Sequence, residues 1–371
     1  MKVLILSCNT GQGHNTAGKA LVEYFSDRGY TCEMRDALEF ASKKTSRIVS
    51  NAYIKLATHS PAIFGLAYYA GGKISSDKHK SVVYGANIRY ANRLGRYIVQ
   101  QKFDAVVMPH LFPAEAVTYL RRKHKLEDVR LYAVATDYAC IPFWEETELD
   151  GYFIPHEDLT EEFIRRGISR NKLIPTGIPV SKRFSLPADR AHARTILNFS
   201  GVRRIYLVMT GSMGFGNVQA LSDGLLSLCG DDDRIIVMGG NNTKLKEKLR
   251  RRYADEPRVL VLDFTREVDR YMQACDVLFT KPGGLTSTEA AVRNVPLIHT
   301  APIPGCETIN ADFFSSRGLS FCLRNMGELE SLVKSLTEEE PVRQKMLEAQ
   351  RREINAFAGD GICDYIEAHK R

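Results

Sequence analysis

The sequence lacks any run of apolar residues near the roughly 20 that a bilayer-spanning helix requires. Its first residues read as a buried strand leading into a polar glycine loop, without the longer apolar region and cleavage site of a signal peptide. Its 8 cysteines are scattered and no two form a C-x-x-C pair, so neither a zinc site nor a disulfide framework is expected. We therefore expect a cytosolic or peripheral protein.

Acidic residues are nearly absent between residues 40 and 100. This stretch holds 10 Lys and Arg but only one carboxylate, Asp77, and so carries +9, whereas the whole chain carries +7. The remainder is therefore close to neutral. Such asymmetry predicts a local anionic partner, either a nucleic acid or a membrane surface.

Within this basic stretch, residues 42–80 mix cations with aromatic and aliphatic side chains. Lys43, Lys44 and Arg47 are followed by a segment that includes Phe64 and Tyr68. This composition suits a lipid interface. The alternative is an ordinary buried helical insertion whose charges face water.

Short apolar strands alternate with amphipathic helices along the chain, which predicts mostly parallel sheets. At 371 residues the chain is too long for one ordinary core. We expect two Rossmann-like α/β domains in tandem, over residues 1–180 and 181–358. Strands are expected at residues 3–7, 31–35, 105–109 and 130–136, and then at 204–210, 234–238, 259–262, 277–280 and 296–299.

Residues 280–289 form the most informative stretch, because a strand-like run leads there into a glycine turn and an Ala-rich helical segment. Gly283 and Gly284 allow backbone N–H groups to approach a ligand, and the unpaired N–H groups of the new helix favour phosphate. The stretch has neither the Gly-Lys-Ser/Thr of a Walker A loop nor the G-x-G-x-x-G spacing of a dinucleotide fingerprint. The alternative is a plain turn with a capping box formed by Thr286 and Glu289.

Two other glycine loops follow predicted strands, at residues 9–16 and 210–217. Ligands of open α/β sheets bind at the carboxyl ends of strands, where these loops lie. His14 falls within the first loop rather than on an apolar helix face, which favours a working imidazole over a histidine that only caps or packs locally. Asp137 follows another predicted strand and is a second candidate.

Further polar residues near strand ends have structural interpretations. We expect Asp158 or Thr160 to cap a helix that begins there, and His156 is open to a purely structural role. The acidic triplet at 231–233 precedes a strand rather than following one. We therefore interpret it as a solvated turn and not as a metal site.

A histidine loop in one domain and a phosphate-binding turn in the other suit glycosyl transfer from a nucleotide sugar. The leaving diphosphate needs stabilisation, and the acceptor hydroxyl must lose a proton. An imidazole with a pKa near 6.5 matches that task at neutral pH.

Five motifs carry a resemblance to a known family: residues 11–16, Thr136-Asp137, residues 176–180, residues 281–286, and Glu307-x-x-Asn310. Together they resemble monogalactosyldiacylglycerol synthases and bacterial diacylglycerol glucosyltransferases, nearly from end to end. The resemblance implies an inverting, metal-independent enzyme of the GT-B fold, with two Rossmann-like domains, a cleft between them and no cofactor. It also implies that residues 359–371 form a helix that packs back toward the first domain.

Carried over to this sequence, the resemblance implies that His14 is the catalytic base, with Asp137 also in the catalytic set. It implies that Gly283, Gly284, Leu285 and Thr286 receive the diphosphate, that Glu289 holds the ribose, and that Glu307 and Asn310 bind the sugar hydroxyls. Phe264 lies where such enzymes hold uracil by backbone contacts. The other implied donor-binding residues are Gly13, Gly211, Ser212, Met213 and Lys281.

The implied partners are UDP-glucose or UDP-galactose, diacylglycerol and anionic membrane lipids, and not nucleic acid, with the protein peripheral on the cytoplasmic face of the cell membrane. Lys43, Lys44, Arg47, Phe64 and Tyr68 are the expected membrane and acceptor contacts. The sequence departs from the family pattern at Ile141, where many relatives have a histidine, and this departure leaves the identity of the acceptor open.

Three other functions compete with this interpretation. The acceptor could be another lipid-linked molecule, or the enzyme could be an isomerase of the UDP-N-acetylglucosamine 2-epimerase type. The basic, aromatic segment argues against the isomerase. A membrane-binding sensor of nucleotide sugars is the non-enzymatic alternative, and it leaves His14 without a task.

Overall fold

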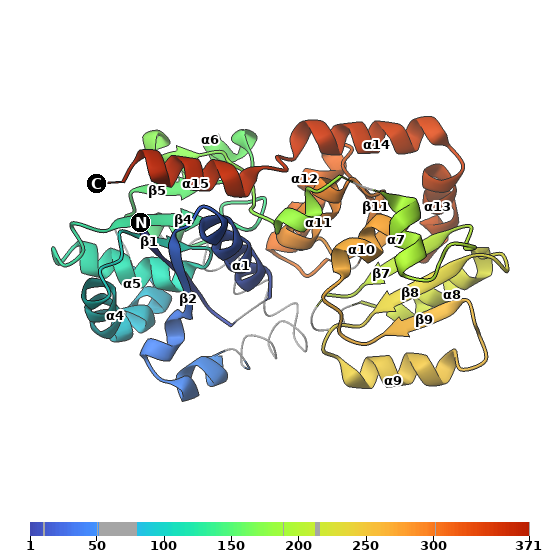
Figure 1. Cartoon of the computed structure of the whole chain (residues 1–371), viewed down its shortest axis with the longest axis horizontal. Helices are drawn as coiled ribbons and strands as arrows, with labels where there is room; N and C mark the ends of the chain where they lie inside the picture. Colours follow the sequence, from blue (N-terminus) through green and yellow to red (C-terminus); the bar gives the residue numbers. More distant parts are fainter. Residues whose placement is uncertain are drawn as a thin grey trace. The chain divides into compact units, whose positions relative to one another are not determined.

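The computed structural model describes residues 1–370 except residues 10–11, 50, 52–79, 188, 212–215 and 301. The chain divides into two compact units (Figure 1). The first comprises Met1–Lys182, Pro304–Cys306 and Asn355–Arg371, and the second comprises Arg183–Ile303 and Glu307–Ile354.

The first unit is built on a six-stranded, all-parallel sheet with the order β2-β1-β3-β4-β5-β6. Its strands are β1 (Lys2–Ser7), β2 (Thr31–Asp36), β3 (Ala105–Met108), β4 (Arg130–Val134), β5 (Gly151–Phe153) and β6 (Leu173–Ile174). Its helices are α1 (Gln12–Asp27), α4 (Val82–Gln100), α5 (Leu111–Arg121), α6 (Thr160–Arg165) and α15 (Ala358–Ala368). Residues 43–49 are also helical.

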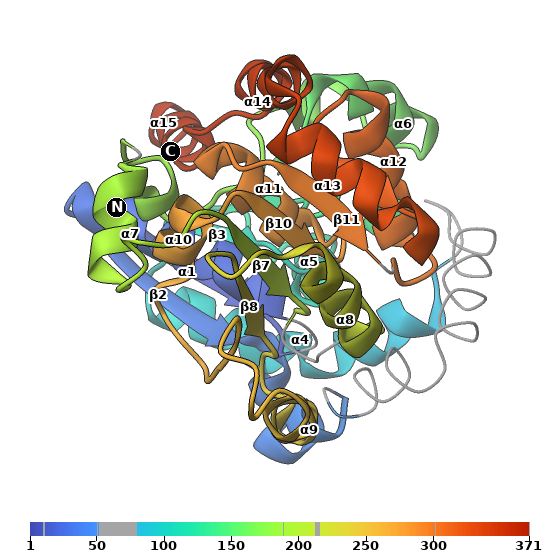
Figure 2. The ribbon, with the colours of Figure 1, turned by 90° about the vertical axis from the view of Figure 1, so that its right-hand side faces the viewer.

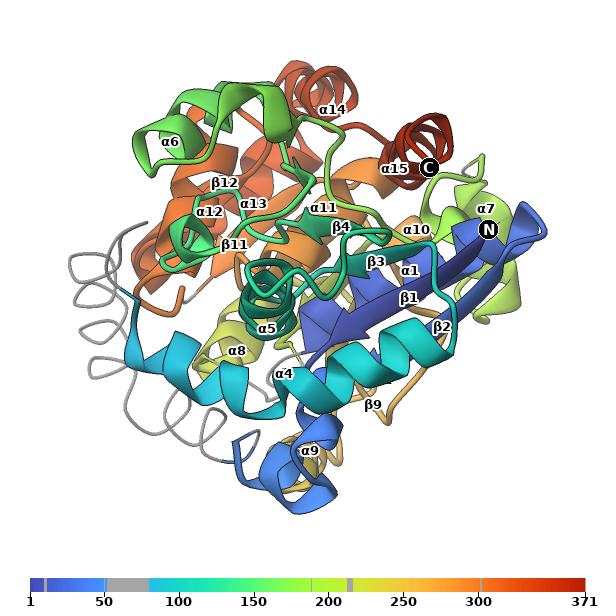
Figure 3. The ribbon, with the colours of Figure 1, turned by 90° about the vertical axis from the view of Figure 1, so that its left-hand side faces the viewer.

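Helices cover both faces of this sheet, as an all-parallel sheet requires. On one face, α1 and α15 bury Leu21, Phe25 and Ile362 against strand residues such as Val107. Figure 3 shows α4 and α5 on the opposite face.

The C-terminal helix α15 is part of the first unit because it packs closely on α1. A Cβ atom placed on Gly359 would lie 2.2 Å from Cε2 of Tyr24, so only glycine fits there. Arg28, directly after α1, forms ion pairs with Asp360, Asp364 and Glu367 of α15 at 2.6–3.0 Å.

The second unit contains another six-stranded parallel sheet, in the order β12-β11-β10-β7-β8-β9. Figure 2 labels β11, β10, β7 and β8 of this sheet. Its strands are β7 (Ile205–Met209), β8 (Arg234–Met238), β9 (Val259–Leu262), β10 (Val277–Thr280), β11 (Leu297–Thr300) and β12 (Phe321–Leu323). Its helices are α7 (Arg190–Ile196), α8 (Val218–Leu228), α9 (Thr243–Arg252), α10 (Val268–Ala274), α11 (Gly284–Arg293), α12 (Cys306–Ser316), α13 (Leu329–Thr337) and α14 (Glu340–Glu353).

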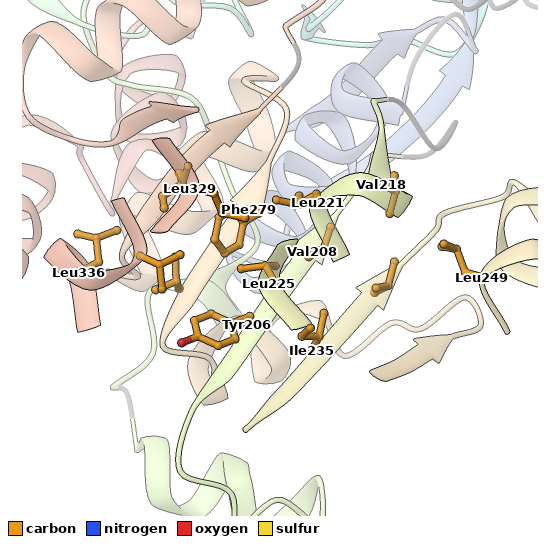
Figure 4. Close-up of a cluster of buried hydrophobic side chains, with 14 of the residues drawn as sticks. Tyr206, Val208, Val218, Leu221, Leu225, Ile235, Leu249, Phe279, Leu329 and Leu336 are labelled. Atoms are coloured by element: carbon orange, nitrogen blue, oxygen red, sulfur yellow. The ribbon is translucent and has the colours of Figure 1, made fainter. Parts of the chain in front are cut away.

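The core of the second unit joins β7, β8 and β10 to α8, α9 and α13 (Figure 4). Tyr206 and Phe279 from the strands and Leu225 and Leu336 from the helices lie within it. From β7 the strands β8 and β9 are added toward one edge of the sheet, and from β10 the strands β11 and β12 are added toward the other edge. The strand order therefore reverses between the neighbouring strands β7 and β10. Such a switch point is where open α/β sheets bind ligands.

The prediction of two Rossmann-like α/β folds is therefore confirmed, but two local expectations were wrong. The acidic triplet is not simply a solvated turn, because Asp233 is fully buried and accepts bonds of 3.0 and 2.7 Å from Nε and Nη2 of Arg203. Neither Asp158 nor Thr160 caps the start of a helix. Instead, His156 accepts a hydrogen bond of 3.2 Å from the N–H of Asp158, at the start of the short 3-10 helix Glu157–Leu159.

Candidate functional site

In the first unit, the carboxyl ends of three adjacent strands meet around His14. The strand β1 ends at Ser7, and His14 lies in the first turn of α1. Its Nδ1 lies 2.9 Å from the carbonyl oxygen of Pro109, which follows β3, and 2.8 Å from Oγ1 of Thr136, which follows β4. Parallel strands place these loops at one edge of the sheet, which is why residues far apart in sequence meet here.

The contact with Pro109 determines which nitrogen of His14 carries the proton. A carbonyl oxygen can only accept, so Nδ1 of His14 must donate to it, and the neutral ring then has its lone pair on Nε2. Burial lowers the pKa of His14 below its usual 6.5, although nearby Asp137 and the Pro109 carbonyl act in the opposite direction. His14 is therefore neutral at pH 7, and its Nε2 is able to accept a proton.

His110 is a functional candidate that the sequence reasoning missed. Its ring packs against that of His14 with centroids 4.7 Å apart at 76°, and its side chain is almost completely buried. The available signal was a histidine directly after the strand expected at 105–109, the same kind of position that singled out His14. No glycine marks this strand end, and the sequence interpretation assigned His110 no role.

In the second unit, β10 ends at Thr280 and α11 begins at Gly284 after the short turn 281–283, with Gly283 as the capping residue. No side chain in the described part of the unit caps this helix end. The capping-box alternative is therefore wrong, because Thr286 lies inside the helix. The first helical hydrogen bond runs from the N–H of Ser287 to the carbonyl of Gly283, so the N–H groups of Gly284, Leu285 and Thr286 come before it. They form the type of helix terminus that binds anions.

Gly211, which follows β7, lies close to Lys281 in the turn before α11, at the switch point of the sheet. Gly211 has φ +69, a conformation that favours glycine, and a Cβ atom there would lie 2.7 Å from Cε of Lys281. The Lys281 ammonium pairs with Glu307 and lies 3.7 Å from the position of a Cβ on Gly283. The Lys281 ammonium thus lies beside the open helix terminus, where it is paired with the Glu307 carboxylate.

The two residues of the Glu307-x-x-Asn310 motif contact the turn before α11, Glu307 through its ion pair with Lys281 and Asn310 through a hydrogen bond to Pro282. Oε2 of Glu307 accepts a hydrogen bond of 3.0 Å from the N–H of Ile303, and Nδ2 of Asn310 donates one of 3.0 Å to the carbonyl of Pro282. The motif therefore lies at the edge of the proposed diphosphate site.

The remaining predicted residues differ in exposure. Glu289 is buried on α11, and burial raises its pKa to about 8, with Arg183 acting against the shift and Asp269 adding to it. Phe264 follows β9 with its side chain 71% exposed, which leaves its backbone as the ligand-binding candidate. Gly13 lies beside His14 on α1 in the first unit. Ser212, Met213, Phe64 and Tyr68 lie outside the described residues, so their predicted roles remain predictions.

Comparison with solved structures gives the class of fold. The chain matches a glycosyltransferase of kitacinnamycin with a TM-score of 0.68 at 12% identity, covering 100% of this chain and 99% of the other. It matches a putative UDP-N-acetylglucosamine 2-epimerase from Listeria monocytogenes with a TM-score of 0.66 at 15% identity, covering 100% and 97%. The two parallel sheets thus have the GT-B architecture that glycosyltransferases and such epimerases share.

Sequence comparison then indicates which glycosyltransferases the chain resembles. Residues 14–180 match the family model for monogalactosyldiacylglycerol (MGDG) synthase. The chain is 29% identical over 355 residues to a processive diacylglycerol beta-glucosyltransferase of Bacillus cytotoxicus, covering 94% of this chain and 88% of the relative. It is 28% identical over 351 residues to the Bacillus subtilis protein of the same name, covering 93% and 89%. The resemblance to this glycosyltransferase family is confirmed.

Proposed function

We propose that this protein transfers a hexose from a UDP-sugar to diacylglycerol, or to an already glycosylated diacylglycerol, with inversion to the β anomer. The observation that carries the proposal is the neutral His14 ring, whose Nδ1 donates to the Pro109 carbonyl and whose Nε2 is left as the proton acceptor. The similarity to diacylglycerol glucosyltransferases supplies the substrate class.

In the proposed mechanism, Nε2 of His14 takes the proton of the acceptor hydroxyl. The oxygen attacks the anomeric carbon on the face opposite the bond to UDP, which inverts the configuration in one step. The imidazolium that forms is stabilised by nearby Asp137 and by the Pro109 carbonyl, the two groups that raise its pKa.

The leaving UDP carries the negative charge of its diphosphate. We assign this charge to the N–H groups of Gly284, Leu285 and Thr286 and to the ammonium of Lys281. Glu307 and Asn310 are proposed to bind the hexose hydroxyls, Glu289 the ribose and the Phe264 backbone the uracil. Neither a metal ion nor a cofactor takes part in this mechanism.

The test is UDP release with UDP-glucose and UDP-galactose, each with and without diacylglycerol, followed by mass spectrometry of the lipids. Release that depends on diacylglycerol, gives a β-hexosyl lipid and survives a chelator supports the proposal. Repeated additions to one lipid would show processivity. Release only with another lipid-linked acceptor, or isomerisation of the UDP-sugar without a lipid, would contradict it.

We further propose that the first unit docks on an anionic bilayer, where diacylglycerol resides. Lys43, Lys44 and Arg47 are exposed on the helical residues 43–49, beside Ile48 at 57% exposure. The 19-residue helix α4 contains no acid, and its exposed cations are Arg89, Arg93 and Arg96. No helix among residues that the structure describes is long and apolar enough to span a membrane.

Docking is tested by co-sedimentation with vesicles containing increasing phosphatidylglycerol. Each cation near an anionic surface contributes about 1 kcal/mol, so replacing Lys43, Lys44 and Arg47 with Gln should release most of the protein. The matched control replaces Lys244, Lys248 and Arg251, three exposed cations of the basic helix α9 in the second unit. If both triple variants are released from the vesicles to the same extent, the attraction depends only on total charge, which would contradict docking through residues 43–49.

A further inference from the structure

His110 lies at the start of α5, where its hydrogen bond determines its own tautomer. The same bond also anchors Pro109, whose carbonyl binds His14. It is the capping residue of α5, and its Nδ1 accepts a hydrogen bond of 3.1 Å from the N–H of Phe112. Nδ1 must therefore be unprotonated, so the neutral ring carries its proton on Nε2. Protonating Nδ1 would replace this cap with two opposed N–H groups.

The residue before His110 supplies the carbonyl that binds Nδ1 of His14. The cap that His110 forms at the start of α5 thus anchors the peptide that orients the proposed base. The ring of His110 also packs T-shaped against His14 on one side and against Phe112 on the other, with centroid distances of 4.7 Å in both cases. One side chain therefore restrains His14 through the backbone and through direct ring contact.

We propose that His110 is a positioning residue for the transfer reaction, which keeps His14 in the tautomer with the Nε2 lone pair and excludes water from one side of its ring. This inference rests on the proposed function of His14 as the base. His110 itself is not placed in contact with a substrate.

The charges around the pair agree with this role. Among the described residues, the titratable groups that act on His14 are Asp137, after β4, and His110, at the start of α5. Burial, and then the proximity of His14, hold the pKa of His110 far below 6.5. A neutral His110 adds no repulsion when His14 becomes an imidazolium, whereas a charged one at this distance would oppose proton transfer.

The direct test compares His110→Asn with His156→Asn. Asparagine is a good capping residue, so both variants keep a helix cap, but only the first removes a ring from His14. We expect His110→Asn to lower kcat about 10- to 100-fold, because small misplacement of a reacting group has effects of that order, with the KM for UDP-sugar unchanged. His156→Asn should leave both constants unchanged.

The pH profile gives a readout that a purely structural role would not change. Burial lowers the pKa of His14, so water admitted by the smaller asparagine side chain in His110→Asn should raise that pKa toward 6.5. Because His14 acts in its neutral form, the acidic limb of the kcat profile should move to higher pH in this variant. An unchanged profile and unchanged kcat in the folded variant would overturn the proposal.

Spectra of ¹⁵N-histidine-labelled wild-type protein test the arrangement even if the variant fails to fold. We expect the proton of His110 on Nε2, that of His14 on Nδ1, and no protonation of His110 near pH 6.5. A proton on Nδ1 of His110, or titration of His110 near pH 6.5, would overturn the proposal. Absence of transfer to any acceptor would instead contradict the proposed function, because the spectra do not depend on activity.

Discussion

In the first unit, the ends of β1, β3 and β4 bring together two imidazoles, a hydroxyl and a carbonyl oxygen. In the second unit, the ends of β7 and β10 bring together a glycine with positive φ, an uncapped helix terminus and the Lys281–Glu307 pair. The first group is neutral and largely enclosed, whereas the second offers N–H donors and a cation. The same edge of a parallel sheet thus provides a proton acceptor in one unit and an anion site in the other.

The difference follows from what each loop leaves unpaired. Around His14, hydrogen bonds to Nδ1 are satisfied, and burial favours the uncharged ring. At α11, glycine at the cap leaves backbone N–H groups without a side-chain acceptor. Substitutions in the first unit should therefore change the rate of proton transfer, and those in the second should change donor affinity.

The largest effect is expected for His14→Ala, which removes the proposed base. General base catalysis contributes typically about 10²- to 10⁴-fold, so kcat should fall by that order while the Kd for UDP stays unchanged. Stopped assays of UDP release and calorimetric UDP binding measure the two quantities. Near-full activity, or an unfolded variant, would mean that His14 only packs or caps locally.

Gly283→Ala should separate binding from folding in the second unit. Gly283 has φ −73, and the nearest described atom to a new Cβ is Nζ of Lys281 at 3.7 Å, so the fold accommodates alanine. The added methyl group should keep a diphosphate from the N–H groups. Losing one hydrogen bond to a charged group costs about 1.5–3 kcal/mol, or roughly 10- to 100-fold in UDP affinity.

The matched control is Gly201→Ala, in the same unit, where no described atom lies within 4 Å of the new Cβ. Its UDP affinity should equal that of the wild type. If Gly283→Ala also binds UDP normally, the terminus of α11 is not the diphosphate site and the contrast between the two units fails.

Glu289→Gln should change how stability depends on pH. Burial raises the pKa of Glu289 from 4.5 to about 8, so the folded state retains a proton that the unfolded state releases above pH 4.5. The free energy of unfolding in the wild type therefore falls as pH rises from about 4.5 to 8, and Gln, which is always neutral, removes this contribution. Each pKa unit corresponds to about 1.4 kcal/mol, so by pH 8 the free energy of unfolding of the variant should exceed that of the wild type by roughly 4 kcal/mol.

Urea denaturation at pH 5 and pH 8 measures this difference. Glu115 provides the equivalent case in the first unit, since burial also raises its pKa to about 8, and Glu115→Gln should show a similar gain. A constant difference between wild type and Glu289→Gln at both pH values would mean that Glu289 is ionised in the folded protein.

The smallest effect is expected for Phe264→Ala, because the side chain is 71% exposed. Stability should change by less than about 0.5 kcal/mol, and UDP affinity should be nearly unchanged. Phe264→Pro removes the backbone N–H and should weaken UDP binding if that group holds uracil. A loss of affinity in the alanine variant alone would assign the contact to the ring instead.

Local sequence signals were sufficient for much of the fold. The predicted strands at 3–7, 234–238, 259–262 and 277–280 match β1, β8, β9 and β10 closely, since buried parallel strands appear as short apolar runs. His14 and Gly283 were found because polar or glycine residues directly after such runs lie at the carboxyl edge of the sheet. His110 satisfied the same rule without an adjacent glycine and was missed.

Three local expectations were wrong, and one of them depended on a partner 30 residues away. Asp233 looked solvated within its acidic triplet, but Arg203 binds it in the fold. The capping pattern of Thr286 and Glu289 is present in the sequence, yet α11 starts before it, at Gly284. His156 caps its own loop where Asp158 and Thr160 were expected to do so.

The sequence by itself determined the alternation of strands and helices and the positions of the glycine loops, because these depend on local hydrophobic period and backbone freedom. Only the tertiary structure decided that His14 donates from Nδ1 to the Pro109 carbonyl and that His110 packs against its ring. Tautomer and pKa depend on burial and on partners about 100 residues away along the chain, and the order β1-β3-β4 of the folded sheet brings those partners together.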